Sequence, residues 1–156
     1  MMGVVAPLSG YCSQSKFMND RIIVATQVSS PLAISPQNSD AQWSSAEPIR
    51  FSADWQGRNP DSSLETEVRG LWSPDVLYLR FVCRYHELFV FEDSDPNGRR
   101  DHLWDRDVAE AFLQPPPATG KNYKEFEVAP NSMWIDLLVS PLGLENLRSG
   151  LSRSVY

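Results

Sequence analysis

The sequence predicts an all-β fold, an antiparallel β-sandwich, on three observations. Apolar and polar residues alternate with a period of two in several short runs, as on the two faces of a strand. Twelve prolines and eight glycines among 156 residues indicate many short elements separated by rigid turns. No segment shows a sustained helical period, and no internal repeat is visible. We therefore expect one domain built from short strands.

The clearest hairpin is expected over residues 64–85. Its first strand carries Glu65, Glu67 and Arg69 on one face and mainly apolar residues on the other. Ser-Pro-Asp at 73–75 then makes a tight turn, and two alternating runs joined in this way form a β-hairpin. The residues expected to face the core are Leu64, Thr66, Val68 and Trp72 in the first strand and Leu77, Leu79, Phe81, Cys83 and Tyr85 in the second.

The other elements follow from the same alternation and from turn-forming residues. Residues 1–20 show no period and are expected to form a loose N-terminal tail, which leaves 21–156 as the domain. Residues 140–156 are polar, and the last six have the composition to begin a further strand. Strands are expected in 21–28, 47–55, 107–114, 122–129 and 132–139, and loops in 29–46 (with Trp43 as its anchor in the core), 56–63 and 92–106.

Composition and charge argue against several classes of partner. The net charge of −6 repels a phosphate backbone, so nucleic acid is not an expected partner. No apolar run approaches the roughly 20 residues of a membrane span, and the start lacks the basic residues and apolar length of a signal peptide. The cellular location stays open. Of the two cysteines, Cys83 is expected to be a buried thiol, and no disulfide framework is expected.

Catalytic patterns are weak in this sequence. No Gly-x-Ser-x-Gly motif occurs, and His86 and His102 lie in charged stretches typical of surface histidines. Asp107 and Glu110 are the obvious pair of carboxylates for sugar hydrolysis. Residues three apart on a strand point to opposite faces, so these two converge only if Asp107 precedes the strand. The chain is therefore expected not to be an enzyme.

The acidic loop before this strand has two readings. Residues 93–98, Asp-Ser-Asp-Pro-Asn-Gly, match the opening of a calcium loop, and Asp101 falls at the ninth position. The twelfth position, which holds a bidentate glutamate in such loops, is Trp104. A solvated acidic loop is the alternative. We expect that no cofactor is required, and calcium is kept as a secondary expectation.

Glu110 is the carboxylate that most needs an explanation. It is in phase with Val108 and Phe112, so it shares a strand face with apolar side chains. Burying an unpaired carboxylate costs several kcal/mol. Either a basic side chain neutralises Glu110, or that face is a cleft with a function. The candidate basic partners are Arg69, Arg80 and Arg84.

Three segments in order resemble carbohydrate-binding module family 9. They are TEVRGLWSPDVLYL at 66–79, LWDRDVAEAFL at 103–113 and YKEFEVAPN at 123–131. The family shows a "T-x-V-R-x-L-W … L-Y" hairpin, then "W-x-x-D-x-x-E-x-F" entering a strand, then a tyrosine-rich hairpin. The resemblance covers roughly residues 30 to 140.

The resemblance implies a β-sandwich that binds saccharides, often the ends of plant polysaccharides, as a non-catalytic module attached to hydrolases. By position, Trp104 corresponds to one wall of the family's aromatic clamp. Asp107 and Glu110 correspond to its hydroxyl-binding carboxylates. An indole covers the C–H face of a pyranose, and a carboxylate accepts charge-assisted hydrogen bonds from hydroxyls. The alternative for Trp104 is a loop anchor packed on the sheet.

Two departures from the family pattern affect this expectation. Some members carry a basic ligand-binding residue on the strand that holds Phe126, where this chain has Glu127. The family domain also continues for several strands that supply a second aromatic clamp residue, whereas this sequence ends at Tyr156. The sandwich is thus expected to be incomplete, with an exposed strand edge prone to association.

Two other functions are alternatives to carbohydrate binding. A related sandwich holds haem, which needs axial ligands such as His86 or His102 with Met133. A degenerate module with only a structural role would bind no ligand.

Overall fold

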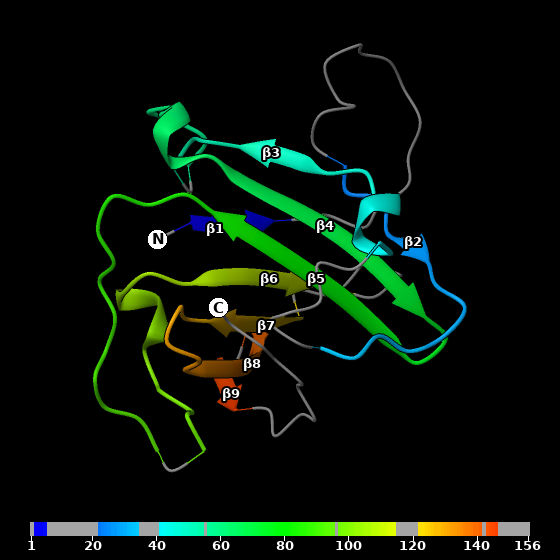
Figure 1. Cartoon of the computed structure of the whole chain (residues 1–156). Helices are drawn as coiled ribbons and strands as arrows, with labels where there is room; N and C mark the ends of the chain where they lie inside the picture. Colours follow the sequence, from blue (N-terminus) through cyan, green and yellow to red (C-terminus); the bar gives the residue numbers. More distant parts are fainter. Residues whose placement is uncertain are drawn as a thin grey trace. The chain divides into compact units, whose positions relative to one another are not determined.

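The computed structural model describes seven segments of the chain: residues 2–5, 22–34, 41–54, 56–95, 97–114, 122–141 and 143–146. Nine strands and three single 3-10 turns make up the regular structure of these segments. The strands form two sheets with antiparallel and mixed pairing (Figure 1). The predicted fold class, all-β with the sheets of a sandwich, is confirmed. No described helix is long and apolar enough to cross a membrane.

The chain divides into two compact units. We call Gln14–Glu87 the central unit, and Met1–Ser13 together with Leu88–Tyr156 the terminal unit. Each sheet belongs to one unit, and each unit has its own buried cluster of apolar side chains.

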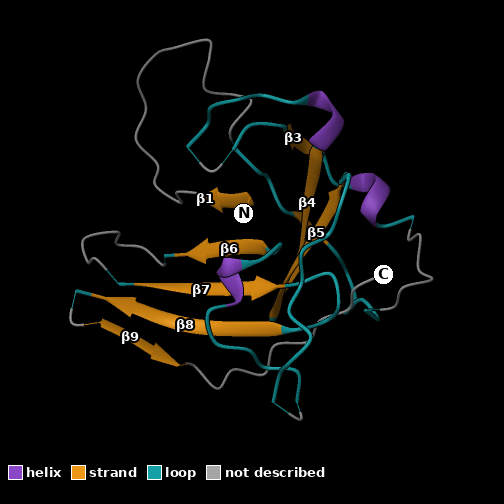
Figure 2. Ribbon diagram, turned by 90° about the vertical axis from the view of Figure 1, so that its left-hand side faces the viewer, coloured by secondary structure: helices purple, strands orange, loops and turns teal. Residues whose placement is uncertain are grey.

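The sheet of the terminal unit has the order β1-β6-β7-β8-β9, which Figure 2 shows as one ladder. β1 runs parallel to β6, and the other three pairings are antiparallel. A 3-10 turn, η4 (Leu103–Asp105), precedes β6. The strands are β1 (Met2–Val5), β6 (Ala109–Leu113), β7 (Tyr123–Val128), β8 (Trp134–Ser140) and β9 (Gly143–Asn146).

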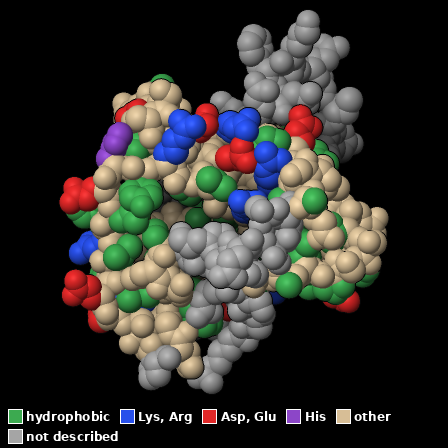
Figure 3. Space-filling model, viewed as in Figure 1, with side chains coloured by type: hydrophobic (Ala, Val, Ile, Leu, Met, Phe, Trp, Pro, Cys, Tyr) green, Lys and Arg blue, Asp and Glu red, His purple; other side chains and the backbone are tan. Residues whose placement is uncertain are grey.

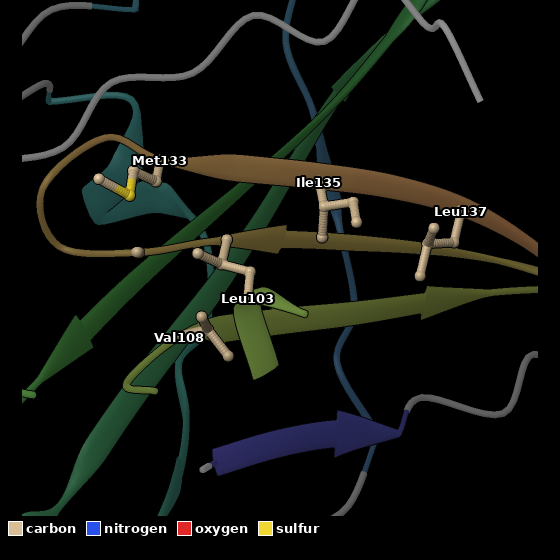
Figure 4. Packing of buried hydrophobic residues seen from close by; sticks show 6 residues of the cluster. Leu103, Val108, Met133, Ile135 and Leu137 are labelled. Carbon is tan, nitrogen blue, oxygen red and sulfur yellow. The ribbon is translucent and has the colours of Figure 1, made fainter. Parts of the chain in front are cut away.

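The apolar core of this unit lies between η4 and the sheet. Leu103 from η4 is fully buried and packs with side chains of β8 and with Val108, which precedes β6 (Figure 4). Alternate residues of a strand share a face, so the core selects one face of β6, β7 and β8. The buried members are Leu103, Val108, Ala129, Met133, Ile135 and Leu137, with Phe91, Trp104 and Val139 packed partly against them.

The sheet of the central unit is centred on β4. The hairpin partner β5 pairs with β4 along all eight residues, so β3 and β2 share the other edge of β4. Two 3-10 turns, η2 (Trp43–Ser45) and η3 (Ser62–Leu64), lie in the connections. The strands are β2 (Thr26–Gln27), β3 (Ile49–Phe51), β4 (Thr66–Ser73) and β5 (Val76–Cys83).

The hairpin 64–85 is confirmed, but the faces assigned to it are partly wrong. Leu71, on the face expected to be polar, is fully buried, whereas Trp72 is 39% exposed. Tyr78, directly opposite Leu71, is buried as well. Cys83 is exposed, so the prediction of a buried thiol is wrong. The reason is a cluster of Val28, Ala46, Leu71 and Tyr78, with Leu32 and the predicted anchor Trp43, on the face that also carries Glu67 and Arg69.

Several boundaries also differ from the sequence expectation. Met2–Val5, inside the segment expected to be a loose tail, forms β1. The strand expected in 21–28 is limited to Thr26–Gln27, and the hairpin turn has two residues rather than three. β9 was not expected at all. The proline run at 115–117 and the strand expected at 151–156 lie outside the described residues.

A short loop motif, Asp-x-x-Gly-Arg, occurs once in each unit, at 54–58 and 95–99. In both loops the aspartate N–H donates to the arginine carbonyl, at 2.8 and 2.9 Å. One carboxylate oxygen of Asp54 or Asp95 accepts from two backbone N–H groups of the loop. The glycine has a φ of +73° or +81°, which favours glycine at that position. This repeat was not predicted from the sequence, because five residues are too short to show a period.

Candidate functional site

One face of β6 and β7 carries carboxyl groups beside the apolar core of the terminal unit. Glu110 of β6 lies directly opposite Glu127 of β7, and Phe112 lies opposite Glu125. Directly opposite residues share a face, and alternation places Val108 on that face too. Three carboxyls therefore occupy the face that also packs the core.

Glu110 and Glu127 are buried, and three of their four carboxyl oxygens have no hydrogen-bond partner in the described parts of the chain. Their residues are 5% and 1% exposed. Oε1 of Glu110 and both carboxyl oxygens of Glu127 have no partner at hydrogen-bonding geometry in the described parts of the chain. Leaving buried polar atoms unmatched costs about 1–3 kcal/mol each, and more for a charge. The fold therefore has to keep these groups neutral or provide them with a partner from outside.

The ionisation of these groups reflects their surroundings. Burial, with the nearby charge of Glu125, raises the pKa of Glu110 to about 7. Burial, contact with the Glu125 carboxyl and the charge of Glu110 raise the pKa of Glu127 well above its usual range. Burial and the charges of Glu125 and Glu110 raise the pKa of the Tyr123 hydroxyl. At neutral pH the pair Glu110–Glu127 holds protons that exposed carboxylates would lose.

The structural ion pair considered for Glu110 is not found. None of the three arginines considered as its partner bonds to it among the described residues. Figure 3 shows acidic and basic side chains interleaved where β3 and β4 lie. All three arginines have other contacts within the central unit: Arg69 binds Glu67 (2.7 Å), Arg84 lies 3.9 Å from Glu65, and the guanidinium of Arg80 lies 6.0 Å from the centroid of the Trp43 ring.

Trp104 stands on η4 at one end of the acidic face. Its neighbour Leu103 anchors η4 in the core, while Trp104 is partly exposed and packs against the edge of the same cluster. The ring of His102 lies 4.8 Å from the ring of Trp104. Asp105, also on η4, contributes to the raised pKa of Glu127, so η4 and the acids are electrostatic neighbours. Trp104 is thus both a loop anchor and a partly accessible ring.

Asp107, the third residue expected in the site, contacts the backbone of Phe89. It precedes β6, as the convergence argument required. Its Oδ2 accepts a hydrogen bond from the N–H of Phe89 at 2.7 Å, and its own N–H donates to the Phe89 carbonyl at 2.9 Å. This double contact ties the loop at Phe89 to the start of β6. The structure relates Trp104 and Glu110 through a shared core and gives Asp107 a different partner.

Sequence reasoning missed Glu125, Glu127 and Tyr123 as site residues. They alternate along β7, which was the available signal, but their position opposite Glu110 depends on the register between β6 and β7. The ring of Tyr123 packs edge-on against Phe112, with centroids 5.6 Å apart. The face therefore has Trp104 near one end, carboxyls in the middle and this aromatic pair at the other end. We call Trp104, Glu110, Glu125, Glu127 and Tyr123 the acidic strip.

The loop considered for calcium uses its carboxylates in other contacts. Asp95 accepts from the backbone of its own turn, as described above. Asp101 accepts from Arg99 at 2.9 Å, and Asp93 lies 3.4 Å from Arg100. Within the described segments, no group of three or more His, Cys, Asp or Glu side chains is placed to hold a metal ion. These contacts correspond to the solvated-loop alternative.

The residues considered as haem ligands also have assigned contacts. Met133 is buried in the apolar core with Leu103 (Figure 4). Nε2 of His86 lies 2.8 Å from the hydroxyl of Ser63, in the central unit. His102 stacks near Trp104 and has a left-handed backbone, with φ of +57°. Their positions lend no support to the haem alternative.

Taken together, fold and site define an all-β protein with an acidic, aromatic-flanked sheet face. No family model matches the chain, and a comparison with solved structures found no match. An "Extracellular protein" of the fungus Arthroderma benhamiae is 32% identical over 69 residues, which are 44% of this chain and 30% of that protein. The chain thus spans less than a third of the length of this relative.

Proposed function

We propose that the terminal unit binds carbohydrate non-catalytically through the acidic strip. The observation that carries this proposal is the buried pair Glu110–Glu127: three of its four carboxyl oxygens have no hydrogen-bond partner among the described residues, and the Phe112–Tyr123 ring pair lies on the same strand face. Saccharides are rich in hydroxyl donors, which the half-buried carboxylate of Glu125 beside this pair accepts in the proposed complex. The sequence resemblance to a family of sugar-binding modules supports the same conclusion.

Each part of the strip has a role in this proposal. The partly exposed indole of Trp104 covers the C–H face of one sugar ring, and Tyr123 packs against a second ring. Tyr123 lies four residues from Glu127 on β7, about 13 Å along the strand. It therefore supplies the second aromatic wall that the family places on later strands. Glu125, which is half-buried, offers the most accessible carboxylate between the two rings.

Binding is favoured over hydrolysis by the state of the carboxyls. Glycoside hydrolysis pairs a protonated acid with an ionised carboxylate that reaches the sugar. Here the pKa values of both Glu110 and Glu127 are raised, and Glu127 is 1% exposed. A role beside hydrolases that degrade polysaccharides, at chain ends of plant polysaccharides, is part of the proposal. So is an extracellular setting, which the name of the fungal relative suggests.

The test is isothermal titration of the whole chain with soluble polysaccharides and oligosaccharides. We expect Trp104→Ala and Tyr123→Ala to abolish or strongly weaken binding while the circular dichroism spectrum is retained. Trp72→Ala is the matched control, because Trp72 is an exposed tryptophan of the central unit. Binding that survives in both strip variants, or is lost in Trp72→Ala alone, would reject the strip as the site.

A further inference from the structure

Among the described residues, β5 is a long strand with a partner on one edge only. All eight of its residues pair with β4, and no other pairing of β5 occurs among the described residues (Figure 1). The two-residue turn closes the hairpin at the pair Ser73–Val76. In such a hairpin the closing pair is hydrogen-bonded, and inward and outward backbone groups then alternate along the strand. The residues whose N–H and C=O groups point outward are therefore Leu77, Leu79, Phe81 and Cys83.

The edge of β5 lacks the features that prevent strand pairing. Natural edge strands are protected by prolines, bulges or several charges. β5 contains neither proline nor bulge, and Arg80 is its single charged residue. Val76, Leu77 and Val82 are 41%, 46% and 47% exposed. A low-charge run of β-branched and aromatic residues with a free edge recruits another strand.

We propose that β5 pairs antiparallel with β5 of a second copy of this chain, around a two-fold axis through Leu79. The axis of such a pair is perpendicular to the sheet, so directly opposite residues must share a face. Odd-numbered residues therefore pair with odd-numbered residues, and even-numbered with even-numbered ones. The two registers centred on the middle of β5 place either Leu79 or Arg80 opposite the same residue of the second copy.

The charge of Arg80 selects between these two registers. With Arg80 on the axis, two guanidinium groups lie directly opposite each other, which destabilises the pair. With Leu79 on the axis, Arg80 lies opposite Tyr78 of the second copy. The same register places Val82 opposite Val76 and Leu77 opposite Phe81. The three exposed apolar side chains of β5 each gain an apolar cross-strand neighbour, which is the stabilising unit of a sheet.

The second copy fits this edge better than an unrelated peptide because the pattern complements itself. Reversal of β5 about Leu79 brings apolar residues opposite apolar residues at every position except Arg80, whose neighbour Tyr78 is aromatic. The pairing joins two central-unit sheets into one continuous sheet. No loop insertion or charged partner is needed for this contact.

The experiment measures mass and contact register in the whole chain. Sedimentation equilibrium over a concentration series should show a monomer–dimer equilibrium. Val82→Lys should raise the dissociation constant about tenfold or more, because an exposed lysine protects an edge. Lysine at the exposed Val82 should leave the monomer folded, which its circular dichroism spectrum checks. A monomer at every concentration would overturn the proposal.

Cysteine cross-linking tests the register. In a background with Cys12→Ser and Cys83→Ser, we expect Leu79→Cys to form a disulfide dimer on mild oxidation, since hydrogen-bonded opposite residues have Cα atoms about 5.5 Å apart. Arg80→Cys is the matched control. Its two copies would lie on a diagonal about 7–8 Å apart, too far for a disulfide. Cross-linking of Arg80→Cys rather than Leu79→Cys would overturn the proposed axis.

Discussion

Each unit contains a directly opposed pair of side chains across neighbouring strands, and the two pairs are built in contrary ways. In the central unit, Arg50 of β3 lies opposite Glu67 of β4 and forms an ion pair with it. In the terminal unit, Glu110 of β6 lies opposite Glu127 of β7. Opposite charges across a pair stabilise a sheet, and like charges destabilise it.

The difference shows which acids the fold itself explains. Glu67 is partly exposed, and hydrogen bonds from Arg69 and Arg50 lower its pKa. Its contacts account for its presence. Glu110 and Glu127 are buried and have raised pKa values. Oε1 of Glu110 and both carboxyl oxygens of Glu127 have no hydrogen-bond partner in the described chain. Since these two acids weaken the sheet when ionised, the contacts of the described chain do not account for their presence.

The largest expected effect comes from the core that surrounds the like-charged pair. Leu103→Ala removes a fully buried side chain and should lower the free energy of unfolding by about 2–5 kcal/mol. It should also admit water to the acids and so reduce the pH dependence of stability. Denaturant unfolding at pH 5 and pH 8 measures both effects. Leu71→Ala, which empties the core of the central unit, should be equally destabilising but leave the pH dependence intact.

Next in size is the pH dependence itself. The pKa of Glu110 is raised from 4.5 to about 7, so the folded state binds a proton that the unfolded state has lost. Its contribution to stability is complete below about pH 4.5 and is lost as the pH rises through about 7, an effect of about 3 kcal/mol. The melting temperature should therefore fall between pH 5 and pH 8.

Glu110→Gln should remove the part of this fall that belongs to Glu110, because an amide of similar shape stays neutral throughout, whereas the raised pKa of Glu127 leaves its own part in place. At pH 8 the variant should melt at a higher temperature than the original chain, yet bind sugar more weakly. A variant with a lower melting temperature at pH 8 and an unchanged pH profile would show that Glu110 has a structural partner after all.

The smallest expected effect belongs to the opposite-charge pair. Glu67→Gln should lower the free energy of unfolding by about 1 kcal/mol or less, because surface ion pairs contribute little. The pKa of Glu67 is lowered, so its contribution is present above its usual pKa of 4.5 and is lost only at more acidic pH. Thermal melts at pH 7 and pH 3 measure this. A loss that persists undiminished at pH 3 would contradict the assignment.

Local patterns in the sequence were sufficient to predict the hairpin and the position of Glu110 on an apolar strand face. The alternation over 64–85 is long, and Glu110 stood out because Val108 and Phe112 share its phase. The faces of β4 were assigned wrongly near Leu71 because both faces are covered there, and alternation indicates a core face only when one side is exposed.

Pairings between distant segments could not be predicted in the same way. Glu127 was missed because a single strand does not reveal its register with the next strand, and a shift of one residue would move its side chain to the other face. β1 was missed because its partner lies far along the chain. The role of Asp107 depends on the backbone of Phe89, which has no sequence signature.

The pairing of β1 with β6 has a consequence for how the chain acquires its structure. Met2 pairs with Ala109, 107 positions further along, whereas the hairpin of β4 and β5 closes within a few residues. Contacts between distant positions form late because a long loop must close first. During synthesis, the central unit can fold before β6, the partner strand of β1, has been made.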